Sequence, residues 1–217
     1  EEVDAYGWPS AEDFDYEDLK RQCDKYPGRA LRIGWPGVFQ AATKLVSDAK
    51  LYMAMAGNPE FAQRLFDRMV AFDLEYYERM FEAADGQIDI LCVCDDYGTQ
   101  SGLLFGVEMW RDFFAENTRR LADLAHRHGA AYMQHSCGAI RPLIPGFIDD
   151  GVDILDPIQV QAAGMDFPGL VRDFGDRLCL HGGVDTQHTL PFGTVDDVRA
   201  QVRSYLDLTG PRGGYIL

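Results

Sequence analysis

A histidine and a cysteine stand two residues apart at the end of an apolar segment, as His135 and Cys137 of the run Ala130–Gly138. In an extended strand, residues two apart point to the same face, so these two side chains would project together. A neutral imidazole and a thiolate are ligands that zinc prefers. The alternative is a buried histidine beside an inert core cysteine. His135 and Cys137 are therefore candidate metal ligands whose assignment needs support from elsewhere in the chain.

Three further apolar runs also end in residues that could do chemistry. Ile88–Cys94 is followed by Asp95 and Asp96, Val152–Leu155 by Asp156 and Gln159, and Arg177–Leu180 by His181 and Asp185. Each run is short and rich in Val, Ile, Leu or Cys, as expected of a strand buried on both faces. The remaining strand candidates are Ala30–Gly34, Ala130–Gln134 and Gly214–Leu217.

Segments with helical periodicity separate these strands. Asn58 precedes a proline at the first helical position, and apolar residues then recur at helical spacing as far as Met80. Three later segments are also helical: one carries Trp110 to Leu124 and ends at Gly129, one runs from Pro142 to Gly151, and one from Thr194 to Gly210. Alternating strands and helices predict an α/β fold with a parallel sheet and crossover helices.

The carboxyl ends of parallel strands meet at one edge, where the following loops form the functional face. The polar residues that end the strands should therefore share one mouth: His135, Cys137, Asp95, Asp96, Gln159, His181 and Asp185. Neighbouring residues of a strand point to opposite faces, so we expect only one of Asp95 and Asp96 to enter the site, although the alternation alone does not say which. The one that does would be a catalytic acid or base, or would orient His135.

Four residues are candidates for substrate binding. Gln159 could orient a substrate through its amide, or satisfy backbone groups at the rim. His181 precedes two glycines, which allow a ligand to approach the backbone closely, and Asp185 lies shortly beyond them. The alternative for His181 is a hydrogen-bonded histidine of the rim. Arg141 is the nearby basic residue of the same mouth.

The length of 217 residues suits one domain with a large core but is short of the roughly 250 residues of a complete eight-fold barrel. We expect a single domain over residues 1–217, with 1–28 an irregular N-terminal connection. The chain begins with Glu1 instead of methionine, and its last candidate strand is cut off at Leu217. Both ends are typical of a fragment.

The net charge argues against two classes of partner. With 35 acidic and 20 basic residues the chain carries a formal charge of −15, which disfavours nucleic acid and anionic membranes. No apolar run approaches the roughly 20 residues of a membrane span, and no signal peptide is visible. The five cysteines lie mostly in apolar runs, which fits a reducing cytoplasm better than a disulfide framework.

Four motifs in a fixed order carry a resemblance to a known family: Asp95–Gln100, His135–Gly138, Gly151–Gln159 and His181–Thr186. From about Tyr6 to Leu217 the chain resembles the uroporphyrinogen decarboxylase (URO-D) superfamily, which also contains the cobalamin-dependent methyltransferases. The resemblance implies a (β/α)8 TIM barrel with its site at the C-terminal mouth. The barrel would be incomplete, because the family's first strands and last loop lie outside the chain.

The methyltransferase branch of this superfamily implies zinc and a corrinoid. Its zinc motif is His-x-Cys, matched by His135 and Cys137, with a third ligand about 80 residues later that would fall just beyond Leu217. Within the chain the possible substitutes are Asp156, Cys179 and His181. The implied reaction moves a methyl group between a small methylated compound, or a thiol, and a corrinoid protein.

The decarboxylase branch implies no metal and a polyanionic tetrapyrrole, uroporphyrinogen. Such a substrate needs basic side chains, whereas the expected mouth holds Asp95, Asp96, Asp156, Asp166 and Asp185 against Arg141. Uncompensated like charges weaken binding, so the sequence favours the metal-dependent branch. A third possibility is a non-catalytic family member that only holds a tetrapyrrole or corrinoid, which the intact His135–Cys137 pair disfavours.

Overall fold

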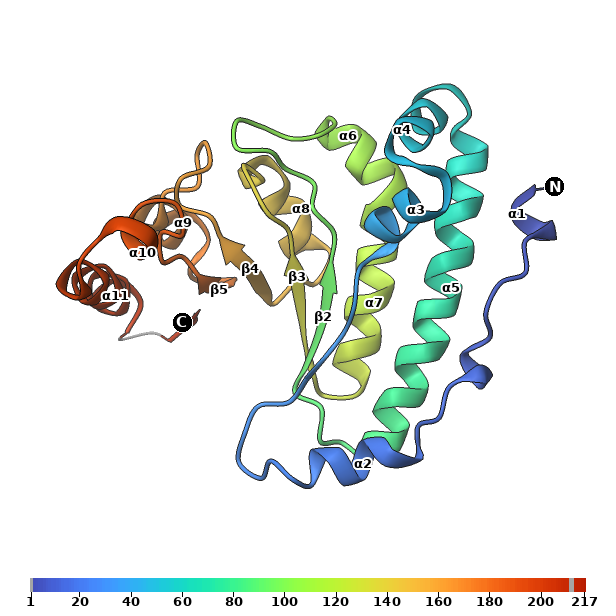
Figure 1. Cartoon of the computed structure of the whole chain (residues 1–217), viewed down its shortest axis with the longest axis horizontal. Coiled ribbons are helices and arrows are strands. Elements are labelled where there is room, and N and C mark those ends of the chain that lie inside the picture. The colour runs from blue at the N-terminus through green and yellow to red at the C-terminus, as the bar shows by residue number, and fades with distance from the viewer. Residues whose placement is uncertain (1, 211–212) are drawn as a thin grey trace.

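The computed structural model describes residues 2–210 and 213–217. Its centre is a sheet of six parallel strands in the order of the sequence, which is a half-barrel arrangement (Figure 1). The strands are β1 (Arg32–Ile33), β2 (Ile90–Cys94), β3 (Ala131–His135), β4 (Ile154–Ile158), β5 (Cys179–Gly182) and β6 (Tyr215–Ile216). The predicted α/β class with a parallel sheet is confirmed.

Each strand lies within or next to a segment that the sequence predicted. The main shift is in β4, which runs to Ile158 and therefore includes Asp156 and a cis peptide bond between Asp156 and Pro157. Cys94 pairs with His135, and His135 pairs with Asp156, so these three residues form one row across the sheet. The ligand-type residues are thus already neighbours through the strand register.

The four predicted helices are present. They are α5 (Pro59–Ala84), the segment formed by α6 (Val107–Trp110), a π-helical turn and α7 (Glu116–Arg127), α8 (Ile144–Asp149), and α11 (Val195–Thr209). At the start of α5, the Asn58 side chain accepts a hydrogen bond from the Phe61 amide, and Thr194 and Asp197 form a capping box at the start of α11. Helices α5 and α7 lie together on one side of the sheet (Figure 1).

Further helices were not predicted. They are α1 (Glu2–Ala5), α2 (Glu17–Cys23), α3 (Val38–Val46), α4 (Asp48–Gly57), α9 (Phe167–Phe174) and the single turn α10 (Thr189–Phe192). The segment 1–28, expected to be irregular, therefore contains the short helices α1 and α2 among irregular stretches in its described part, and both helices pack against α5. These helices are short, so few residues are available to establish a period.

The two faces of the sheet differ in what they bury. The outer face contributes side chains such as Leu91, Tyr132 and Leu155 to the main core beneath the helices. The inner face forms a separate cluster centred on Cys92, Met133 and Ile154. Its partly buried members are Ile90, Cys94, Ala131, Cys179 and Ile216. Since faces alternate along a strand, this cluster identifies which strand-end residues point inward.

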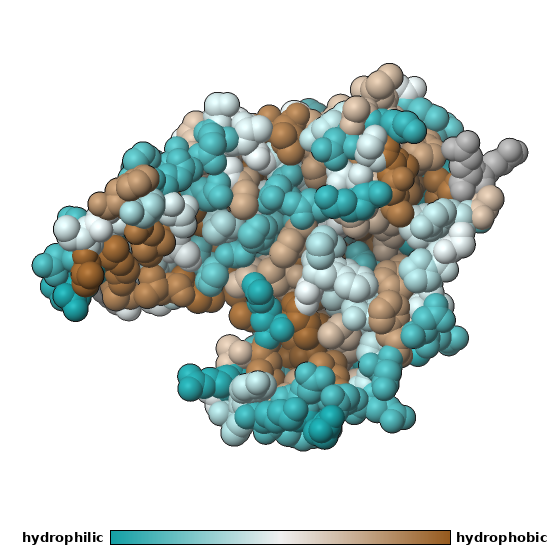
Figure 2. Space-filling view, in the orientation of Figure 1, coloured by the Kyte–Doolittle hydropathy of each residue, from teal (hydrophilic) through white to brown (hydrophobic). Residues whose placement is uncertain are grey.

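The surface is mainly polar over the elements seen in Figure 2, with apolar areas over the α10–α11 end of the molecule. Exposed apolar side chains in that region are Leu190, Phe192, Val195, Leu206 and Leu208. Among the described helices, none combines the length and the apolar character needed to cross a bilayer.

Candidate metal centre

Three side chains at the carboxyl ends of β2 and β3 bring together an oxygen, a nitrogen and a sulfur atom. They belong to Asp96, His135 and Cys137, and their ligand atoms all lie within 4.8 Å of one another. Nε2 of His135 lies 3.6 Å from Sγ of Cys137 and 3.6 Å from Oδ1 of Asp96. The three residues are partly buried, so the group is shielded and still accessible from the mouth.

The strand register explains why these residues meet. Asp96 continues the inward-facing series of Cys92 and Cys94, and Cys137 continues that of His135. Because Cys94 pairs with His135, the next inward positions along the two strands, Asp96 and Cys137, are also neighbours. The backbone amide of Cys137 donates a hydrogen bond to Oδ1 of Asp96 over 2.7 Å. This bond fixes the carboxylate beside the thiol.

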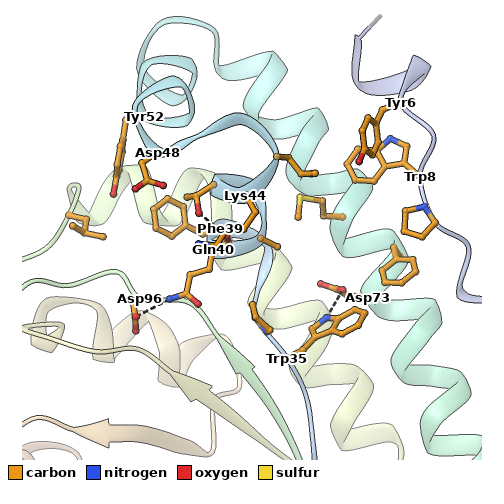
Figure 3. Close-up of a pocket in the computed structure, with 18 residues that line it drawn as sticks. Tyr6, Trp8, Trp35, Phe39, Gln40, Lys44, Asp48, Tyr52, Asp73 and Asp96 are labelled. Carbon is orange, nitrogen blue, oxygen red and sulfur yellow. Dashed lines mark hydrogen bonds between the residues drawn. The ribbon is translucent and has the colours of Figure 1, made fainter. Parts of the chain in front are cut away.

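A second hydrogen bond to Asp96 comes from helix α3. Nε2 of Gln40 donates to Oδ2 of Asp96 over 2.8 Å, as Figure 3 shows. Both oxygens of the Asp96 carboxylate therefore accept a hydrogen bond. One comes from the loop after β3 and the other from α3. Gln40 was not among the predicted site residues, because nothing in the local sequence around it indicates its proximity to Asp96.

The carboxylate of Asp156 connects two histidines. Nδ1 of His135 donates to Oδ2 of Asp156 over 2.6 Å, and Nδ1 of His181 donates to Oδ1 of the same carboxylate. Burial alone would raise the pKa of Asp156, but these two hydrogen bonds hold it below its usual value. An ionised Asp156 accepts only, so the proton of each neutral ring lies on Nδ1 and Nε2 carries the free lone pair.

The surroundings raise the pKa values of the imidazole and the thiol of the group for different reasons. The hydrogen bond to Asp156 raises the pKa of His135, against the opposing effect of burial. Burial, reinforced by the negative charge of Asp96, raises the pKa of Cys137 to about 12. In the absence of a cation the thiol of Cys137 is therefore protonated at neutral pH. A bound divalent cation deprotonates a coordinating thiol outright.

The donor set and its spacing fit a zinc ion. Zinc binds nitrogen at about 2.0 Å and sulfur at about 2.3 Å in tetrahedral sites, so its nitrogen and sulfur ligands lie roughly 3.5 Å apart. The distance of 3.6 Å between Nε2 of His135 and Sγ of Cys137 matches that spacing. Histidine, cysteine and aspartate are all established zinc ligands, and Asp156 provides the carboxylate that commonly supports a zinc-bound histidine.

Cys94 lies in the same row as His135 and was expected only as part of a buried strand. Its sulfur is 4.0 Å from that of Cys92, the next inward residue below it. The hydrogen bond from the Cys92 thiol lowers the pKa of Cys94, while the same interaction raises that of Cys92. A thiol whose pKa is lowered by its neighbour thus lies in the same row as His135.

Asp95 faces away from this group. Its buried carboxylate accepts hydrogen bonds from the amides of Phe39 and Gln40, at 3.2 and 2.8 Å, and from the Tyr97 hydroxyl at 3.1 Å. Burial raises the pKa of Asp95 to about 7, against the effect of these hydrogen bonds. The alternation of the strand therefore sends Asp96 into the site and Asp95 to the first turn of α3.

The other predicted site residues are Gln159, Asp185 and Arg141, and they do not all adjoin the group. Gln159 adjoins the group, since its Oε1 accepts a 2.8 Å hydrogen bond from the amide of Gly138. Asp185 binds the amides of Gln187 and His188, and so orders the loop after β5. Arg141 is not brought to the group. It forms an ion pair with Asp173 and donates to the carbonyl of Gly164.

The loop after β3 is packed closely against the loop after β2. Gly138 has a φ of +89°, and a Cβ atom at this position would lie 2.6 Å from the carbonyl carbon of Gly98. Only glycine fits both that backbone conformation and that contact. The glycine that follows Cys137 therefore allows the two site-bearing loops to touch.

Comparison with known proteins decides the family. Residues 17–217 match the model of the family described as uroporphyrinogen decarboxylase (URO-D). The chain belongs to the URO-D family. The predicted resemblance is thereby confirmed. A search of curated protein sequences finds no match.

Two solved structures show the same kind of fold as this URO-D family member. A methyltransferase from Methanosarcina mazei aligns over 89% of this chain and 54% of its own, with 22% identity and a TM-score of 0.71. A 3-keto-D-glucoside 4-epimerase from E. coli aligns over 93% of this chain and 78% of its own, with 13% identity and a TM-score of 0.54. The chain thus spans about half the length of the methyltransferase.

The third metal ligand expected from the family resemblance would lie after Leu217. Within the described residues, Asp96 supplies a third ligand atom that the sequence interpretation did not consider. Of the substitutes that it did consider, Asp156 is hydrogen-bonded to His135 and His181 is hydrogen-bonded to Asp156. Cys179 pairs with Ile154 in the apolar layer below. Asp96 lies two residues after the inward-facing Cys94, and this spacing is the sequence signal that could have identified it as a candidate ligand.

Proposed function

We propose that this URO-D family member is a zinc-dependent methyltransferase that acts with a corrinoid protein. It would transfer a methyl group between a small methylated compound, or a thiol, and the corrinoid carried by that partner. The proposal rests on one observation, the cluster of an imidazole, a thiol and a carboxylate at the carboxyl ends of β2 and β3. The six strands would be part of an eight-stranded TIM barrel with this cluster at its mouth.

The zinc would be held by Nε2 of His135, Sγ of Cys137 and the carboxylate of Asp96. When bound, zinc lowers the pKa of a coordinated thiol or polarises an ether oxygen as a Lewis acid. A structural zinc site has four protein ligands, whereas a catalytic one leaves a position open to substrate. Three candidate ligands among the described residues correspond to the catalytic kind.

The surrounding residues would position these ligands. Asp156 keeps the proton of His135 on Nδ1, so that Nε2 presents its lone pair to the metal. Gln40 fixes the rotation of the Asp96 carboxylate. His181, bound to the other oxygen of Asp156, leaves its own Nε2 available to move a proton at the substrate.

Substrate would enter beside the loops that follow β4 and β5. Gln159 and Asp185 line a cavity of about 330 Å³ there, together with Gln161, Gln187 and Leu190. The amide groups of this wall offer both donors and acceptors to a small polar molecule. Arg141 forms an ion pair with Asp173. It would therefore help to shape the mouth and would not contact the substrate.

The charges of the site disfavour the decarboxylase reaction. Asp96 lies in the group itself, Asp156 is hydrogen-bonded to His135, and Asp185 lies in the adjoining loop. Among the described residues, no arginine forms a hydrogen bond or ion pair with Asp96, His135, Cys137, Asp156 or His181. A polyanionic tetrapyrrole would meet uncompensated negative charge at this mouth.

The proposal is tested by metal content and methyl transfer in matched variants. His135→Ala and Cys137→Ala are each stripped with a chelator and reloaded with zinc beside the unchanged protein. Zinc is measured by mass spectrometry, and methyl transfer from a methylated corrinoid to a thiol by the corrinoid absorbance. Cys179→Ala is the control, because it removes a thiol from the inner face one layer below the group.

We expect about one zinc per chain in the unchanged protein and in Cys179→Ala, and neither zinc nor methyl transfer in the other two variants. Stoichiometric zinc in both His135→Ala and Cys137→Ala would overturn the metal assignment. Conversion of uroporphyrinogen to coproporphyrinogen by the fully chelated protein would establish the decarboxylase instead.

A further inference from the structure

A large cavity lies between the N-terminal segment, α3 and α5 (Figure 3). Its volume is about 770 Å³. Six aromatic side chains line it: Tyr6, Trp8, Trp35, Phe39, Tyr52 and Phe72. Asp96 also lines the cavity, so this space reaches the candidate metal centre. None of the roles assigned so far uses it.

One carboxylate of the cavity wall is buried. Asp73 of α5 is only 6% exposed, and its Oδ1 accepts a 3.1 Å hydrogen bond from Nε1 of Trp35 (Figure 3). Its other oxygen accepts no hydrogen bond from any residue that the structure describes. Burial raises the pKa of Asp73 to about 7. A buried carboxylate with a free oxygen costs stability unless a cation or a donor meets it.

The aromatic part of the wall is rigid. The ring of Trp35 stacks on that of Tyr76 with centroids 4.5 Å apart and planes 3° apart, and Phe72 lies nearly parallel to both. The ring of Trp8 already carries a cation, since the guanidinium carbon of Arg68 lies 5.5 Å from its centroid. Aromatic faces attract cations through their quadrupole, more strongly where water is excluded.

The charges along the cavity have one predominant sign. Asp48, Asp73 and Asp96 line it, and Lys44 is the one basic side chain among its described lining residues. Lys44 is exposed and forms no ion pair with any of these carboxylates. An anionic ligand would therefore be repelled, whereas a cation would pair with the ionised form of Asp73.

The geometry points to a binding site for a small organic ammonium ion with an apolar periphery, such as a quaternary ammonium compound, held between Asp73 and the aromatic wall. Such an ion is weakly hydrated because alkyl groups surround its nitrogen, and it combines both properties that the cavity offers. Binding does not depend on the proposed function. Only a role for the bound ion in the proposed reaction would rest on it, since the cavity reaches the candidate metal centre at Asp96.

The experiment compares choline with 3,3-dimethyl-1-butanol by calorimetry at pH 8. The two probes have the same shape, but a carbon replaces the charged nitrogen in the second. We expect choline to bind about tenfold more tightly than the alcohol. Asp73→Asn should remove that preference, whereas Asp67→Asn, an exposed aspartate of the same helix, should retain it. Thermal melts establish that both variants are folded.

Equal affinity for choline and the neutral alcohol in the unchanged protein would overturn the inference, as would an unchanged preference in a folded Asp73→Asn. The same titration is repeated after zinc removal, with zinc content measured separately. Choline binding by a protein that never takes up zinc would refute the proposed function and leave this binding site in place. Zinc uptake without choline preference would do the reverse.

Discussion

Nδ1 of His135 lies 2.6 Å from Oδ2 of Asp156, on the neighbouring strand of the sheet. The bond places the proton of the neutral imidazole on Nδ1 and turns Nε2 toward Cys137. A residue outside the group of candidate ligands therefore sets which nitrogen of His135 carries the proton.

Asp156→Asn should weaken zinc binding by about 10- to 100-fold, the usual effect of removing a carboxylate that supports a zinc-bound histidine. An amide can accept the same hydrogen bond but does not make the ring more basic. The measurement is a competition with a chromogenic chelator. Asp149→Asn, at the exposed end of α8, is the control and should bind zinc as the unchanged protein does. Equal zinc affinity in both variants would contradict a supporting role for Asp156.

Asp95→Ala should destabilise the fold by about 1–2 kcal/mol, since it removes the acceptor for the first amides of α3. Zinc content should not change, because the carboxylate faces away from His135. Asp95→Asn keeps an acceptor and should lose less stability. Urea unfolding of the three proteins gives the difference. A variant that loses zinc while its free energy of unfolding stays the same would assign Asp95 to the metal centre after all.

The stability contribution of Asp73 should fall as pH rises. Its pKa is raised from 3.8 to about 7 in the folded protein, so between these values the folded state keeps a proton that the unfolded state releases. The free energy of unfolding then decreases by up to about 1.4 kcal/mol per pH unit, and levels off above the folded pKa. Below both pKa values the two states bind the proton equally and this effect vanishes.

Asp73→Asn removes this titration while its amide oxygen can still accept from Trp35. The variant should therefore gain stability relative to the unchanged protein as the pH is raised from 5 to 8. Denaturant unfolding at several pH values measures the difference, and Asp67→Asn should show no such trend. A constant difference between Asp73→Asn and the unchanged protein over this range would mean that Asp73 is ionised throughout.

Gly138→Ala should destabilise the protein by about 1–3 kcal/mol, because the positive φ and the contact with Gly98 both exclude a Cβ atom. Any relaxation would separate the two loops and move Cys137 away from Asp96, so zinc affinity should fall as well. Gly102→Ala is the matched control in the same region, since a Cβ atom there meets nothing within 4 Å. Comparable melting temperatures for the two variants would show that the loops do not need this close approach.

The strands and the inward series of ligands could largely be predicted from local sequence. Apolar runs interrupted by His135 and Cys137 identify both a buried strand and its polar end, and the period of two then places their side chains on one face. The same rule predicts that Asp95 and Asp96 diverge. It does not say which one points inward, because that depends on which face the helices cover.

The contacts between distant segments could not be predicted in this way. Helix α3 begins at Val38 without a capping side chain of its own, and the acceptor for its first turn is Asp95, which lies more than fifty residues later in the sequence. The contact between Gln40 and Asp96 also joins segments far apart in the sequence, so it could not be predicted locally either. Arg141 was expected as the nearby basic residue of the mouth, but its ion pair with Asp173 of α9 keeps it from contacting the group.

Asp95 and Asp96 point in opposite directions, and helix α3 is hydrogen-bonded to both of them. The first-turn amides of this helix donate to Asp95, and Gln40 of the same turn donates to Asp96. The two residues that follow β2 are therefore both held by the first turn of α3. The aromatic cavity is bounded by later residues of that helix, among them Ala41, Thr43 and Leu45. A molecule that fills the cavity and displaces α3 would also shift the carboxylate beside Cys137. If the group holds zinc as proposed, occupancy of the cavity and zinc affinity would thereby be coupled.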